Sequence, residues 1–211
     1  DTFAMRWKPP LRLTVTAHAS APGDSLRGTA GFGFWNHPLS PAKMRLPKLP
    51  RAVWFFFSAP PSDLRLAYGV PGHGWKAATL DATRPRALAL APLAPILVLL
   101  MRFPPLYHRL WRSVQGALGI SEKALDGALL AERHTYTLDW RENGAAFAVD
   151  GSVVYESSVS PRGACGFIAW IDNQYAVATP QGKLRWGLVP LEREQSLLID
   201  HVSIQALSYE G

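Results

Sequence analysis

Residues 134–157 carry the clearest alternation of apolar and polar positions in the chain. Tyr136, Leu138 and Trp140 are each followed by a polar residue, which predicts a strand with one buried face. Glu-Asn-Gly and Asp-Gly turn sequences then separate this run from two further strand-like runs. We therefore expect a β-meander of three antiparallel strands here.

Strand-like runs recur along most of the rest of the chain. They occupy residues 11–16, 28–37, 52–59, 62–70, 76–82, 166–177, 184–189 and 196–207. Many short strands joined by turns favour antiparallel pairing in two packed sheets. The 211 residues, of which 48% are hydrophobic, suit a single core. The sequence predicts an all-β fold, a sandwich of two antiparallel sheets, in one domain spanning 1–211.

One segment, at about 87–131, departs from the strand pattern. Its apolar run at 93–101 is shorter than a membrane span and is interrupted by prolines. From Leu106, apolar residues recur at helical spacing through Leu110, Val114 and Leu118. We expect a helical insertion between two strands of the sandwich.

The charge pattern narrows the classes of partner. The formal net charge is +6, but the basic residues are scattered without a run of five like charges. No nucleic-acid-binding motif is present, so we predict no nucleic-acid partner. Cys165 is the single cysteine, which excludes an intrachain disulfide and leaves the cellular compartment open.

The meander and the chain's end resemble one enzyme family. "HTYTLDWRENGAAFAVDGSVVY" and "LLIDHVSIQAL" are similar to segments of family 16 glycoside hydrolases. This resemblance implies a concanavalin A-like jelly roll for the predicted sandwich. It also implies a possible structural calcium ion at the position of Asp200, and no other cofactor is indicated.

The residues that cleave sugars in that family are missing. Its retaining chemistry requires an ExDxxE strand, in which alternation brings carboxylates about 5 to 5.5 Å apart onto one face. The chain instead reads "VWFFFSAPPSDL", with Asp63 as the one acid. We therefore expect a non-hydrolytic binding protein, and whether any other catalysis occurs is left open.

Aromatic and amide side chains are the candidate ligand-binding residues. Aromatic rings match the C–H faces of sugars and of apolar ligands, and amides supply directional hydrogen bonds. A concave face of the jelly roll would carry these groups and hold a saccharide or a glycosylated, amphiphilic molecule. The candidates are Trp35, Asn36, His37, Trp54, Phe56, Trp75, Trp170, Asn173, Gln174 and Tyr175.

Two other functions are alternatives to a binding protein, and each requires different residues. An enzyme, hydrolase or lyase, would need Asp63, His73 and Asp172 to come together as an acid/base group. A lipid- or membrane-surface-binding protein would use the apolar stripe of residues 92–118. If this stripe packs instead on Trp54 and Phe56 as a lid, it would enclose an apolar pocket, which we favour over the membrane surface.

Overall fold

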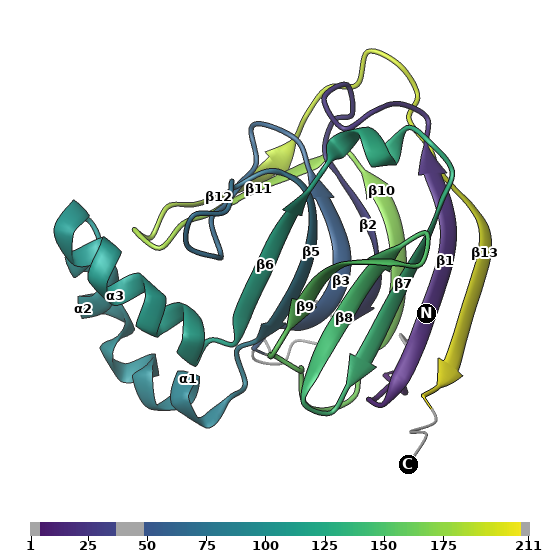
Figure 1. Ribbon diagram of the computed structural model, residues 1–211. Helices are drawn as coiled ribbons and strands as arrows, with labels where there is room; N and C mark the ends of the chain where they lie inside the picture. Colours follow the sequence, from purple (N-terminus) through teal and green to yellow (C-terminus); the bar gives the residue numbers. More distant parts are fainter. Residues whose placement is uncertain (1–4, 37–48, 208–211) are drawn as a thin grey trace.

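The computed structural model describes residues 5–36 and 49–207 (Figure 1). The strands are β1 (Leu11–Ala19), β2 (Thr29–Trp35), β3 (Arg51–Ser58), β4 (Asp63–Leu64), β5 (Gly74–Asp81), β6 (Ile120–Leu125), β7 (His134–Arg141), β8 (Gly144–Val149), β9 (Ser152–Ser157), β10 (Gly166–Asp172), β11 (Gln174–Ala178), β12 (Leu184–Leu188) and β13 (Leu197–Ala206). The helices are α1 (Pro85–Leu90), α2 (Ala94–Leu100) and α3 (Pro104–Ala117), with 3-10 turns η1 (Ala91–Leu93) and η2 (Gly127–Leu130).

Two five-stranded sheets face each other. Their strand orders are β13-β1-β7-β8-β9 and β10-β2-β3-β5-β6, and every neighbouring pair within them is antiparallel. The predicted β-sandwich is therefore confirmed, and so is the meander, which forms β7, β8 and β9. A third sheet, β12-β11-β4, is smaller and includes one parallel pair.

The core between the sheets consists of interlocking aromatic rings. Phe32 and Phe55 of one sheet meet Tyr136 of the other with ring centroids 5.2 and 5.1 Å apart. Trp75 joins them by stacking on Phe55 at 5.8 Å, and only 1% of Trp75 is exposed. Aromatic contacts of this kind add to the free energy gained from burial, so they stabilise the packing of the two sheets against each other.

The helical insertion is confirmed, but its predicted extent of about 87–131 is wrong at the C-terminal end. Helices α1 to α3 cover residues 85–117, and residues 120–125 form β6, which pairs with β5 at the edge of the second sheet. The helical path ends at Gly119, where φ is +58°, a value that glycine adopts without the steric cost of a side chain. Figure 1 shows the helices beside β6, at the opposite end of the molecule from β13.

The helices have their own small apolar core. Met101 and Trp111 are buried against Ala67, which follows β4, and against Ile120 of β6. This packing attaches the insertion to the edge of the second sheet. Within the described residues, no helix is long and apolar enough to cross a membrane.

Candidate functional site

The second sheet turns one face to the core and the other away from it. Cross-strand partners share a face, so Gly31 lies in one row with Phe56 and Trp170, and Gly33 lies in the next row beside Trp54. We call the side that carries these residues the outer face. Trp75 was predicted to line it, but alternation along β5 turns Trp75 into the core and Lys76 outward.

Four half-buried rings gather on the outer face, and we call them the aromatic patch: Trp35, Trp54, Phe56 and Trp170. Trp54 is at the centre, 5.5 Å from the ring centroid of Trp35, 5.4 Å from that of Phe56 and 5.5 Å from that of Trp170. Four of the predicted binding residues are thus brought together. Half-buried rings held by one another present a preformed apolar surface at low entropic cost.

Two glycines make this arrangement possible. A Cβ atom on Gly33 would lie 2.5 Å from Cβ of Trp54, and one on Gly31 would lie 2.8 Å from Cη2 of Trp170. Both distances are too short for real atoms, so any larger residue would push the rings away. In the sequence "GFGFW", the two glycines therefore leave bare backbone under the indoles on the outer face. The two phenylalanines alternate with them and face the core.

A hydrogen-bond chain fixes the orientation of Trp170. Its Nε1 donates to Oγ1 of Thr29 at 2.9 Å, and that hydroxyl donates to Oδ1 of Asp172 at 2.9 Å. The same carboxylate oxygen accepts from the backbone N–H of Gln174 at 3.0 Å. Asp172, predicted as a candidate acid or base, thus supports the turn after β10 and the aromatic patch.

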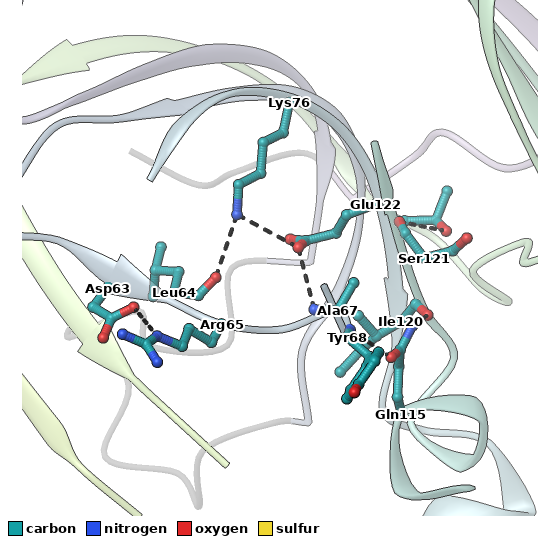
Figure 2. Close-up of polar contacts among 11 residues, drawn as sticks. Asp63, Leu64, Arg65, Ala67, Tyr68, Lys76, Gln115, Ile120, Ser121 and Glu122 are labelled. Atoms are coloured by element: carbon teal, nitrogen blue, oxygen red, sulfur yellow. Dashed lines mark hydrogen bonds and ion pairs between the residues drawn. The ribbon is translucent and has the colours of Figure 1, made fainter. Parts of the chain in front are cut away.

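A buried ion pair between Lys76 and Glu122 lies on the outer face, in the rows that also carry Phe56 and Trp54. Figure 2 shows its contacts. Nζ of Lys76, the cross-strand partner of Phe56, is 3.5 Å from Oε2 of Glu122, and the two side chains are 1% and 3% exposed. Nζ also donates to the carbonyl of Leu64 at 3.3 Å, and Oε2 accepts from the N–H of Ala67 at 3.2 Å. The segment after β4 therefore covers the pair and is anchored by it.

Burial governs the protonation of both groups. It raises the pKa of Glu122, although Lys76 and the N–H of Ala67 act in the opposite direction. Burial also lowers the pKa of Lys76, against the attraction of Glu122 and, more weakly, of Asp63. In both cases loss of hydration outweighs the attraction between the partners.

An apolar pocket of about 360 Å³ lies between the insertion and the turn that follows β11. Its walls include Leu97, Val98 and Val114 from the helices and Ile120 from β6. Among the described residues that line it, Arg65 is the single charged one. The lining does not include Trp54 or Phe56, so the insertion forms a pocket beside the aromatic patch instead of the predicted lid over it.

The predicted amide cluster serves the backbone. Nδ2 of Asn36 donates to the carbonyl of Leu49 at 2.9 Å, and its Oδ1 accepts from the N–H of Arg51 at 2.9 Å. Nδ2 of Asn173 donates to the carbonyl of Val189 at 2.9 Å. Both asparagines therefore join strand ends.

The other three polar candidates are less informative. Tyr175 is half-buried and packs over Gly187, where a Cβ atom would lie 2.7 Å from its ring. The side chain of Gln174 is exposed. His37 lies outside the described residues.

The predicted acid/base residues are engaged separately. Asp63 accepts from Nε of Arg65 at 2.8 Å, Asp172 is held by Thr29, and His73 is exposed before β5. Within the part of the chain that the structure describes, no hydrogen bond or ion pair joins these three side chains, and each has a different surrounding.

Asp200, the predicted calcium position, accepts a hydrogen bond from Nε of Arg133 at 2.6 Å. No cluster of three or more His, Cys, Asp or Glu side chains suitable for a metal occurs in residues 5–36 and 49–207. The guanidinium group of Arg133 therefore engages one oxygen of this carboxylate, and the calcium ion stays a prediction from the resemblance.

Comparison with models of known protein families finds no match, and no curated protein matches the sequence significantly.

Sequence reasoning missed Lys76 and Glu122. Each is a charged residue within a strand-like run, "GWKAATL" for Lys76 and "ISEKAL" for Glu122. Strand alternation turns both side chains onto the outer face. Opposite charges in two strand-like runs are a signal in the sequence that the two runs pair in one sheet. The pairing of β5 with β6 was hidden because the second run was assigned to the insertion.

Proposed function

We propose that the protein is a non-hydrolytic binding protein for a glycosylated amphiphile. One observation carries the proposal: the aromatic patch and the apolar pocket share the outer face of one sheet. Trp35, Ala52, Leu80 and Ile120 form a single row across β2, β3, β5 and β6. Trp35 belongs to the patch and Ile120 to the pocket wall, so the two sites lie at the ends of this row.

The two sites suit the two halves of such a ligand. Indole faces pack against the C–H faces of a sugar ring, and the half-buried Trp54 and Trp170 supply them. The pocket's aliphatic walls suit an alkyl chain, and its volume lies in the range of small-molecule sites, which is about 300–1,000 Å³. We propose that the sandwich is a jelly roll related to family 16 glycoside hydrolases.

Binding is favoured over catalysis by the state of the charged groups. Glu122, the carboxylate with a raised pKa on this face, is buried under the segment after β4 and bonded to Lys76 and Ala67. A substrate could reach it only after that segment moved. Retaining hydrolysis also requires two carboxyl groups about 5 to 5.5 Å apart that both face the substrate.

The proposal is tested by calorimetric titration with monomeric dodecyl maltoside, maltose and dodecanoate. We expect the maltoside to bind more tightly than either half. Trp54→Ala should weaken maltoside binding by about tenfold through loss of apolar contact, without changing dodecanoate binding. Ala94→Trp, which places an indole at the pocket wall, should weaken binding of both ligands that carry a chain.

Ala89→Trp is the matched control, because Ala89 is exposed on α1 and does not line the pocket. Maltoside binding that is unchanged in both Trp54→Ala and Ala94→Trp would contradict the proposed site. Incubation with laminarin and lichenan tests the absence of hydrolysis. Release of reducing ends that stops in Glu122→Gln would replace the binding function with an enzymatic one.

A further inference from the structure

The insertion exposes an unusual number of large apolar side chains. Ile96 and Leu99 of α2 are 57% and 54% exposed, and Phe103 before α3 is 58% exposed. Leu88 and Leu93 are also about half exposed. Single exposed apolar residues are common on protein surfaces, but a contiguous set of them marks an interaction site.

A second exposed apolar set lies on β12, the edge strand of the small sheet. Leu184, Trp186 and Leu188 alternate along this strand and therefore share one face. Trp186 is 82% exposed. A tryptophan with so little packing adds nothing to the core, which points to a partner outside this fold.

The two sets meet in space. The turn between β11 and β12 touches α2, since a Cβ atom on Gly182 would lie 2.6 Å from Cγ1 of Val98. Figure 1 shows the hairpin and the helices projecting on the same side of the sandwich. We call the combined surface of α1–α3 and β12 the apolar rim.

The segments that form the apolar rim carry charges of one sign. The sequence contains no Asp or Glu from residue 82 to 121 or from 173 to 191, although the chain has 16 acidic residues. The same segments contain exposed cations, among them Arg102, Arg109, Lys183 and Arg185. An apolar surface whose own charged residues are all cations is complementary to a lipid surface with anionic headgroups.

We propose that the apolar rim docks on the surface of an anionic lipid bilayer. Ile96, Leu99, Phe103 and Trp186 enter the boundary between headgroups and acyl chains, and the arginine and lysine side chains reach the phosphates. This goes beyond the proposed ligand and does not depend on it. It also gives the pocket a source of amphiphiles, because Leu97 and Val98 of α2 line the pocket while Ile96 and Leu99 face outward.

Co-sedimentation of the full chain with vesicles tests the proposal. We expect binding to vesicles of phosphatidylcholine with phosphatidylglycerol at low salt, and weak binding to phosphatidylcholine alone or at high salt. Phe103→Asp and Trp186→Asp should each reduce binding severalfold. Arg102→Glu with Arg109→Glu and Arg185→Glu should reduce it roughly tenfold or more.

Matched controls separate docking from general effects of charge and apolarity. Val153→Asp changes a valine that is 62% exposed on β9, outside the apolar rim, and Arg193→Glu reverses a cation that lies between Glu192 and Glu194. Both should bind anionic vesicles as the wild type does. Quenching of tryptophan fluorescence by lipids with brominated chains should decrease in Trp186→Phe, with circular dichroism confirming the fold of each variant.

Absence of binding to the anionic vesicles at low salt would overturn the proposal. Equal loss in the controls and in the rim variants would overturn it as well. The surface could instead join two copies of the chain. Sedimentation that shows a dimer in solution, dissociated by Phe103→Asp or Trp186→Asp, together with no vesicle binding, would assign the rim to self-association.

Discussion

Nζ of Lys76 lies 3.5 Å from Oε2 of Glu122, with both side chains almost completely removed from solvent. Each charge is compensated by the other and by one backbone group, the carbonyl of Leu64 in β4 for Lys76 and the N–H of Ala67 after β4 for Glu122. Removing one partner leaves a buried, unpaired charge, whereas removing both leaves an apolar contact. This asymmetry can be measured.

We expect Lys76→Met to lower the free energy of unfolding by about 3–5 kcal/mol, because Glu122 would stay buried without its cation. The double variant Lys76→Met with Glu122→Leu should lose less than Lys76→Met alone. Urea unfolding of the wild type and of the three variants gives these differences, with Glu122→Leu as the third. A double variant that loses the full sum of the single losses would show that the pair is not coupled.

The raised pKa of Glu122 predicts a dependence of stability on pH. A carboxyl whose pKa is higher in the folded state favours folding below its ordinary pKa, near 4.5, and this contribution is lost as pH rises through the folded value. The free energy of unfolding of the wild type should therefore decrease relative to that of Glu122→Gln as pH rises above about 4.5. Unfolding curves from pH 4 to 8 measure it, and a difference that shifts in favour of the wild type would rule out a raised pKa.

The backbone under the aromatic patch predicts opposite effects for two glycine substitutions. Gly33→Ala should destabilise the protein by about 1–3 kcal/mol, because its Cβ would collide with Trp54 and the carbonyl of Val53. Gly116→Ala, in α3 with open space around the new Cβ, should stabilise by about 0.5–1 kcal/mol. Thermal unfolding compares them. A neutral Gly33→Ala would mean that Trp54 does not lie against β2.

Substitution of Asp150, which is remote from the outer face, is expected to change the stability of the protein. The φ of Asp150 is +49° in the turn between β8 and β9, and its Oδ1 accepts from the N–H of Thr135 at 2.8 Å. That bond and the contact with His134 lower the pKa of this carboxyl. Asp150→Ala should lose about 1–2 kcal/mol of stability because alanine disfavours positive φ.

Asp150→Asn is the control, since asparagine tolerates this conformation. Ligand and vesicle binding should be unchanged in both variants, because the turn belongs to the first sheet. A loss of binding at an unchanged melting temperature would place Asp150 in a functional site instead.

Local alternation in the sequence predicted much of the sandwich. The run with Tyr136, Leu138 and Trp140 forms β7 as expected, because each of these side chains points into the core and the polar residues between them do not. The aromatic patch was also predicted in part, with Trp35, Trp54, Phe56 and Trp170 on one face. The face that each residue takes depends on its neighbours in the chain, whereas the contacts among the four rings come from the pairing of β2, β3 and β10.

The errors arose where apolar residues occupy both faces of a strand. Trp75 was placed on the outer face because β5 offers apolar side chains on both sides, so alternation could not show which side faces the core. Residues 120–125 were assigned to the insertion, since six residues with two charges resemble a polar helix end as closely as an edge strand. Only pairing with β5 distinguishes the two.

The sequence by itself determined most of the segments that become strands or helices, β6 excepted, because that choice depends mainly on the side chains of residues close together in the chain. The tertiary structure alone decided that Lys76 meets Glu122, 46 residues away, and that the helices and the turn after β11 enclose a pocket. Contacts of this kind depend on the register between strands and on which distant segments cover a face. Local pattern leaves both undetermined, because alternation marks the side of a strand but not what will pack against it.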